Sequence, residues 1–287
     1  MATASDPNLG YEVGIICALP LEATAVKGIF DEIYEVVGDN GIKKARGDIG
    51  SYTTGKIGHH KVVLGHMAGI SKVNAAAVAQ SFLASFGGLR LVLLVGICGA
   101  IPRGIDGSEI VLGDVVIAKN VIQTDFGSQY DDGFARKQNA EDSLGKHAAE
   151  LFQKPGYEDS MYFGTKDDRL FSADYLHKHR QQGRDCDCKE PGRTCALAKQ
   201  ASCDQLGCSS SHLLFRERLR DDRAHRLAIH LGTVASSEAV MKSVRHRNNV
   251  AEAEKAIAFE MEGAGLWDSL PSNAGAEYIL PARPMTH

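Results

Sequence analysis

The fold class follows from residues 71–100, SKVNAAAVAQSFLASFGGLRLVLLVGICGA. Ser71 is a good helix N-cap, the alanine-rich run behind it favours a helix, and Gly87-Gly88 ends that helix. Residues 89–95 are then almost continuously apolar, which is typical of a parallel strand that is covered on both faces. The stretch therefore predicts a helix that leads into a fully buried strand.

The same alternation of strand and helix continues on both sides of this stretch. Pro20 opens a helix after a predicted strand at 11–17, and 51–57 with 61–66 predict a β-hairpin. Further along, the pattern predicts strands at 115–118, 228–235 and 256–260, and helices at 236–244 and 261–270. This order of elements predicts an α/β fold with a mixed or parallel sheet.

Length and charge narrow the class of protein. A chain of 287 residues, 44% hydrophobic and 24% charged, can bury a full core. Its formal net charge of -4 provides no basic surface, so neither nucleic acid nor a membrane is expected as a partner. The N-terminus has no apolar signal segment, and the longest apolar run, residues 91–98, is too short to span a bilayer. We therefore expect a soluble, cytoplasmic protein.

The character of the chain changes between residues 138 and 226, where apolar runs vanish and polar and charged residues increase. We interpret 138–226 as a polar, cysteine-rich insertion within a domain that covers residues 11–270. Residues 271–287 are expected to form an irregular C-terminal tail. Within the insertion, residues 216–223 mix both charge signs and predict a solvated helix.

Five of the seven cysteines lie in this insertion: Cys186, Cys188, Cys195, Cys203 and Cys208. With His212 close behind, they could supply four soft ligands to a structural zinc ion. The spacing lacks the paired C-x2-C knuckles of standard zinc ribbons, so one or two disulfides and free thiols stay open as alternatives. The cluster is expected to be structural in each case.

Polar residues gather where the predicted strands end, which is where α/β sheets bind ligands. The loops there carry three glutamates and two serines: Glu22, Glu260, Glu262, Ser236 and Ser237. A strand that ends in acidic residues is unusual in a buried sheet, because a buried carboxylate without partners is costly. The sequence therefore predicts a polar pocket for a neutral hydroxylated ligand such as a sugar.

Four segments resemble, in the same order, the nucleoside phosphorylase and nucleosidase superfamily, and most of all its methylthioadenosine/S-adenosylhomocysteine nucleosidase branch. They are GIICALPLEATAV (14–26), GHMAGISKVNAAA (65–77), LLVGICGA (93–100) and IAFEMEGAG (257–265). The resemblance implies a three-layer α/β/α sandwich of the nucleoside phosphorylase type, with a mixed sheet. It also implies that no cofactor is required.

The resemblance further implies roles for single residues. Glu262 matches the glutamate that hydrogen-bonds the ribose hydroxyls, and Met261 matches the methionine packed beneath the sugar. Glu22 matches the carboxylate that orients and deprotonates the attacking water in the nucleosidases. The other expected substrate-binding residues are Glu260, Gly96, Cys98, Gly99, Ser236 and Ser237, with Ile97 and Ala100 standing where serine and glycine are often found.

The activity implied is cleavage of the N-glycosidic bond of a purine nucleoside or nucleotide. Water is favoured over phosphate as the acceptor, because residues 17–22 offer a carboxylate and no arginine. In the family, an aspartate after the next strand protonates the leaving base, and residues 269–287 contain no aspartate. We therefore expect a chain that lacks its last strand and helix and has weak or absent catalysis. The alternative is a non-catalytic nucleoside-binding, sensing or interaction module. A homo-oligomer is expected from the family.

Overall fold

The computed structural model describes residues 7–34, 42–131, 133–137, 167–180, 186–220, 226–269 and 275–284, together with Thr165 and Ala224. Residues 138–164 of the predicted insertion lie outside this described part. Among the helices that are described, none is long and apolar enough to cross a membrane.

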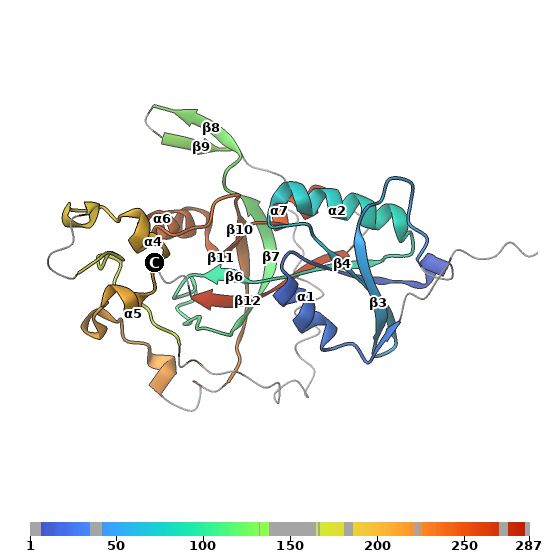
Figure 1. The fold of residues 1–287 in the computed structure, drawn as a ribbon, viewed down its shortest axis with the longest axis horizontal. Helices are drawn as coiled ribbons and strands as arrows, with labels where there is room; N and C mark the ends of the chain where they lie inside the picture. The colour runs from blue at the N-terminus through green and yellow to red at the C-terminus, as the bar shows by residue number, and fades with distance from the viewer. Residues whose placement is uncertain are drawn as a thin grey trace, which may run out of the picture.

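A ten-stranded mixed sheet runs through the molecule in the order β2-β3-β4-β1-β5-β12-β6-β11-β10-β7 (Figure 1). Strand β1 is parallel to both β4 and β5, whereas β6 is antiparallel to β11. A separate hairpin, β8 (Gly127–Tyr130) and β9 (Gly133–Arg136), extends beyond the end of β7. The strands of the main sheet are β1 (Val13–Cys17), β2 (Glu32–Tyr34), β3 (Ser51–Ile57), β4 (His60–His66), β5 (Leu91–Val95), β6 (Cys98–Ala100), β7 (Val115–Gln123), β10 (Ile229–Ser236), β11 (Ala256–Glu260) and β12 (Gly275–Pro284).

Helices cover both faces of this sheet. Because successive strand residues point to opposite faces, Ile15 of β1 packs in one core cluster with Ala23 and Val26, whereas Ile16 packs in another with Phe82. The first pair belongs to α1 and Phe82 to α2, so the two helices lie on opposite faces. The predicted three-layer α/β/α sandwich is confirmed. The main helices are α1 (Pro20–Lys27), α2 (Lys72–Ser85), α6 (Val244–Glu254) and α7 (Gly263–Trp267).

The C-terminal segment differs from the expected irregular tail. Residues 275–284 form β12, which pairs in parallel with β5 and β6 and antiparallel with β7. The backbone edge of a central strand needs hydrogen-bond partners, and β12 supplies them along β5. Pro281 and Pro284 hid this strand from the sequence pattern, because proline lacks an N–H and interrupts strand signals. The expectations of an irregular 271–287 tail and a missing last strand are therefore wrong for residues 275–284.

Strand β12 also closes part of the sheet upon itself. Its pairings complete a ring in which β7, β10, β11, β6 and β12 follow one another. Strands that lie far apart in sequence are thereby held side by side. The loops at their ends are positioned by this ring.

The helix predicted at residues 236–244 is not present. Strand β10 continues through Ser236, and the next helix, α6, begins only at Val244. The reason is a local cap: the Ser243 hydroxyl accepts a hydrogen bond from the His246 N–H and starts the helix there. Residues 237–243 are left as an open loop beside the end of β11.

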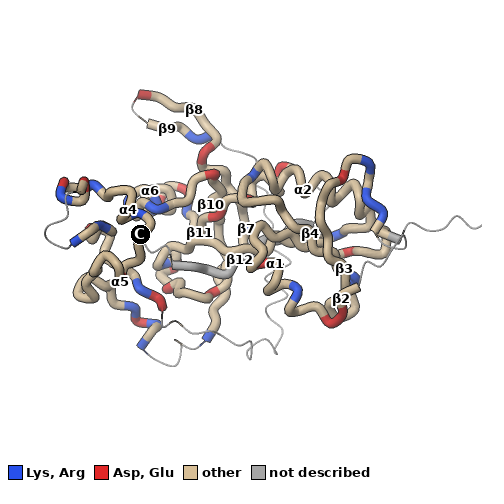
Figure 2. Tube along the Cα trace, viewed as in Figure 1, with Lys and Arg blue, Asp and Glu red and all other residues tan. Residues whose placement is uncertain are grey.

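A buried ion network joins the described part of the insertion to the sheet. Arg218 donates to the carboxylate of fully buried Asp114, with Nη2 and Oδ1 2.8 Å apart. Arg216 is also buried and donates to the Ile110 carbonyl. The predicted solvated helix is wrong for residues 216–220, where the structure shows a short 3-10 turn, η5 (Glu217–Arg220), and a buried Arg216. Residues 221–223 lie outside the described part. Acidic and basic residues are interspersed along the described part of the trace (Figure 2).

The rest of the described insertion consists of short elements. They are η3 (Asp187–Lys189), α4 (Ala196–Gln200), α5 (Cys203–Leu206) and η4 (Ser210–His212). Two described parts of the insertion pair with each other, because Phe171 forms a β-bridge with Leu213. Between these two residues, the structure describes 172–180 and 186–212.

Candidate active site

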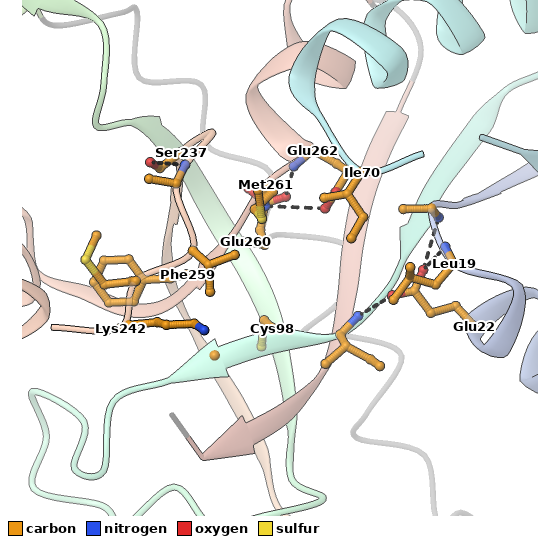
Figure 3. Close-up of a pocket in the computed structure, with 16 residues that line it drawn as sticks. Leu19, Glu22, Ile70, Cys98, Ser237, Lys242, Phe259, Glu260, Met261 and Glu262 are labelled. Carbon is orange, nitrogen blue, oxygen red and sulfur yellow. Dashed lines mark hydrogen bonds between the residues drawn. The ribbon is translucent and has the colours of Figure 1, made fainter. Parts of the chain in front are cut away.

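A cavity of about 370 Å³ opens where the strands of the ring end (Figure 3). This volume falls within the range of small-molecule sites. Four segments and Ile70 line it: the start of α1 with the residues before it (Ala18, Leu19, Glu22), the turn into β6 (Ile97, Cys98, Gly99), the loop after β10 (Ser237, Ala239, Val240, Met241, Lys242) and the end of β11 (Phe259, Glu260, Met261, Glu262). The structure thus gathers residues that are separated by more than 200 positions in the chain.

Backbone amides hold the Glu22 carboxylate in one orientation. Oε2 accepts the N–H groups of Ala18 at 3.0 Å and Leu19 at 2.8 Å, and Oε1 accepts the N–H of Ile97 at 2.9 Å. A carboxylate offers about four acceptor positions, so about one remains for a ligand or water. Glu22 is 8% exposed and lines the cavity. The sequence therefore places a rigid, buried acceptor at this wall.

Gly96 supports Glu22 and does not line the cavity. A Cβ atom at position 96 would lie 3.1 Å from Oε1 of Glu22, which is tighter than ordinary contact. The glycine allows the β5–β6 turn to approach the carboxylate closely enough for the Ile97 hydrogen bond. Cys98 and Gly99, by contrast, do line the cavity. Burial, with the nearby charge of Glu260, raises the pKa of the Cys98 thiol, so this side chain is a neutral wall.

The two glutamates at the end of β11 have different environments. Glu260 is buried, and its Oε2 accepts the N–H groups of Glu262 at 2.8 Å and Gly263 at 2.5 Å. Burial nevertheless raises the pKa of Glu260. Burial and the charges of Glu260 and Glu22 raise the pKa of Glu262 to about 8.

The two carboxylate oxygens of Glu262 differ in their hydrogen bonds. Its Oε2 accepts the Met261 N–H at 3.3 Å, whereas its buried Oε1 has no hydrogen-bond partner within the described residues. Buried polar atoms are nearly always satisfied in folded proteins. Since Glu262 lines the cavity, a bound hydroxyl would satisfy this oxygen.

The two serines support the loops around the glutamates. Ser236 is fully buried behind the cavity, and its Oγ accepts the Ala264 N–H at 3.1 Å. Ser237 lines the cavity, and its Oγ accepts the Ala239 N–H at 3.1 Å. Of the expected substrate-binding residues, Gly96 and Ser236 therefore lie behind the cavity lining, and the others reach it.

Sequence reasoning missed part of the lining. Lys242 was assigned to a helix that does not form, and it enters the cavity from the side opposite Glu22 (Figure 3). Phe259 stands within the quoted IAFEMEGAG segment, but no role was expected for it. Ile70 also lines the cavity and stands in the GHMAGISKV segment, and no role was expected for it either. The two segments that resemble the superfamily could have indicated Phe259 and Ile70 as lining residues. Nothing in the sequence indicates that Lys242 reaches the cavity.

The cysteines of the insertion fall into two groups, each with a histidine. His179 lies with Cys186, Cys188 and Cys195, and His177 lies with Cys203 and Cys208. No disulfide joins the described cysteines, which are all free thiols. His212, the histidine expected from the sequence, stacks on Tyr175 with ring centroids 4.1 Å apart and is in neither group. The two histidines were missed because they precede the first cysteine.

Proteins of known sequence align with this chain over part of their own length. The chain is 29% identical to a nucleotide-binding leucine-rich repeat (NLR)-like protein of Hyaloscypha variabilis, with 89% of the chain aligned. It is 33% identical over 121 residues to the 5'-methylthioadenosine/S-adenosylhomocysteine nucleosidase of Mycobacterium bovis, with 42% of the chain aligned. The chain spans 25% of the length of the first relative and 40% of the second.

Solved structures share the fold. The MTA/SAH nucleosidase of Streptococcus pneumoniae, in complex with 8-aminoadenine, matches with a TM-score of 0.55 and 20% identity, covering 96% of this chain and 86% of that one. The futalosine hydrolase of Helicobacter pylori matches with a TM-score of 0.51 and 16% identity over the same shares. The model of the phosphorylase superfamily matches residues 12–267, and the chain therefore belongs to that superfamily.

Proposed function

We propose that the cavity binds a purine nucleoside and cleaves its N-glycosidic bond with water. The observation that carries this proposal is the convergence of Glu22, Met261 and Glu262, from two distant segments, on one cavity beside the turn into β6. Superfamily membership and the nucleosidase relatives support the reaction class. Glu262 would accept the ribose hydroxyls through the oxygen that has no partner within the described residues. Met261 would pack beneath the sugar.

Charge favours water over phosphate as the acceptor. Glu22 lines the wall at which the acceptor would lie, and Lys242 lines the opposite side of the cavity. A phosphate about 4 Å from a carboxylate would be repelled by about 4 kcal/mol per charge pair at a protein-like dielectric. Water meets no such repulsion, and Glu22 retains an acceptor position to orient and deprotonate it. The amides that hold Glu22 fix the direction from which the water would attack.

A second candidate function is nucleoside binding without cleavage. It is favoured by one observation: among the described residues that line the cavity, none is an aspartate that could protonate the leaving base. General acid catalysis is commonly worth about 10²–10⁴-fold in rate. A site with Glu22 and Glu262 but no such acid would bind the nucleoside and release the base slowly.

The two functions separate in one pair of measurements on the full chain: calorimetric binding of 5'-methylthioadenosine or adenosine, and release of free adenine with and without phosphate. Cleavage predicts adenine release that is independent of phosphate and is lost in Glu22→Gln. Binding without release supports the second function. Glu252→Gln, on the exposed side of α6, is the matched control and should leave both measurements unchanged. If Glu262→Ala retains the wild-type affinity, the assignment of the pocket is wrong.

A further inference from the structure

The insertion carries side chains that converge without any role in the cavity. His179 Nδ1 lies 3.7 Å from Cys186 Sγ, 3.7 Å from Cys188 Sγ and 3.4 Å from Cys195 Sγ. Zinc–sulfur and zinc–nitrogen bonds of about 2.3 and 2.0–2.1 Å place the ligand atoms of a tetrahedral site about 3.6 Å apart. The spacing of these four atoms therefore matches a Cys3His zinc site.

A second group repeats the arrangement with three ligands. His177 Nδ1 lies 3.7 Å from Cys203 Sγ, and the ligand atoms of His177, Cys203 and Cys208 all lie within 4.8 Å of one another. The Nε2 of His177 is 2.9 Å from the Ala201 carbonyl, which must accept the Nε2–H. This bond assigns the ring proton to Nε2, so Nδ1, which lies beside Cys203 Sγ, is the nitrogen that can bind a metal, as is usual for histidines that bind through one ring nitrogen.

We propose that residues 177–208 bind two zinc ions, one in a Cys3His site and one in a Cys2His site. The sulfur atoms are supported as metal-bound thiolates are: the Cys195 N–H donates to Cys188 Sγ at 3.3 Å, and the Ala198 N–H donates to Cys195 Sγ at 3.4 Å. Soft thiolates with imidazole in tetrahedral geometry select zinc over magnesium or calcium. The sites use His177 and His179 and leave out His212.

The region needs such ions because its own core is small. The buried cluster there consists of Cys188, Ala198 and Leu206, with the neighbouring cysteines packed around it. The helices α4 and α5 have five and four residues, far below the length at which isolated helices are stable. Zinc binding supplies the folding free energy that a core of this size lacks.

Metal content of the full chain tests the proposal. After purification with a non-chelating reductant, mass spectrometry of the elements should find two zinc ions per chain. Cys195→Ser and Cys208→Ser should each retain one, and the double variant none. His212→Ala is the matched control and should retain two, because its ring stacks on Tyr175 outside both groups.

Two outcomes would overturn the proposal: less than one zinc per chain in the wild type, or iron in its place. A single zinc that survives Cys208→Ser would refute the second site. Cobalt titration of the metal-free wild type covers the case in which a variant fails to fold. Two equivalents of Co²⁺ should produce the intense thiolate-to-cobalt bands of tetrahedral sites, and a nearly colourless complex would contradict both sites.

Discussion

The cavity in the sheet and the cysteine–histidine region at 177–208 are organised in opposite ways. In the cavity, backbone amides of a ten-stranded sheet hold the carboxylates, as for Glu22, which accepts three N–H groups. In the insertion, short helices surround converging thiols and a core of three buried residues. The sheet positions its functional groups by itself, whereas the insertion requires an ion.

This difference implies that the two regions can be disturbed separately. The insertion is joined to the sheet at its base through Arg216, Arg218 and Asp114. None of these three residues lines the cavity, and none belongs to the proposed zinc sites. Loss of the ions should therefore loosen 177–208 and leave the sheet folded.

The largest effect is expected from zinc removal. Structural zinc sites have apparent binding free energies of about 10–16 kcal/mol at neutral pH, so a strong chelator should unfold 177–208. Limited proteolysis should then cut within 177–208 at least about tenfold faster, while the thermal transition of the sheet stays in place. Added zinc should restore protection. Loss of the sheet's transition on chelation would break the proposed separation.

Glu22→Gln should have the next largest effect, on the rate of adenine release. Removing a general base commonly costs about 10²–10⁴-fold in rate, so adenine release should fall by that factor. The amide of glutamine keeps one acceptor oxygen for the backbone N–H groups but cannot take a proton from water. Zinc content should be unchanged, and the Glu252→Gln control should release adenine at the wild-type rate. Retention of activity in Glu22→Gln would contradict the assigned role.

Gly265→Ala should destabilise the sheet without touching the insertion. A Cβ atom at position 265 would lie 1.9 Å from the Lys72 carbonyl oxygen, so α7 and the start of α2 could not keep their contact. We expect the free energy of unfolding to fall by about 1–3 kcal/mol in urea titrations. At Gly87 the nearest atom, Leu9 Cδ2, would lie 3.8 Å away, so Gly87→Ala is the matched control. Equal stability of the two variants would contradict the close approach.

Much of the sheet could be predicted from the sequence because its signals are local. The apolar run at 91–95 and the hairpin at 51–66 have the periodicity of strands, and both were found where expected. Strand β12 was missed because its stability comes from pairing with β5 and β6, and two prolines mask its pattern. Long-range pairing of this kind leaves no mark in a local window.

The candidate site divides in the same way. Glu22 and Glu262 could be found because they stand in recognisable segments at strand ends, and both line the cavity. Lys242 could not be found, since its place depends on where α6 begins, and Ser243 sets that start. His177 and His179 reach the cysteines only through the folding of the insertion. Proximity in space between short, irregular segments is the part that the sequence conceals.

The smallest effect that we expect concerns the pH dependence of stability. Burial first, and then the charges of Glu260 and Glu22, raise the pKa of Glu262 to about 8 from a usual value of 4.5. Between pH 4.5 and about 8 the folded state therefore holds a proton that the unfolded state has released. The free energy of unfolding contributed by this group falls as the pH rises through that window and is flat above it.

Glu262→Gln removes the carboxyl group that titrates. The pH dependence of the free energy of unfolding that remains then comes from the other groups of the chain. At pH 8.5 the variant should be more stable than the wild type by roughly 1–3 kcal/mol, with little difference at pH 4.5. Urea titrations at several pH values measure the slope, and Glu252→Gln, with its exposed side chain, should keep the wild-type slope. If Glu262→Gln and the wild type lose stability equally between pH 5 and 8, the carboxyl of Glu262 is ionised in the empty cavity. The oxygen offered to the ribose would then be charged before the nucleoside arrives, and its affinity for hydroxyl donors would not change with pH across this range.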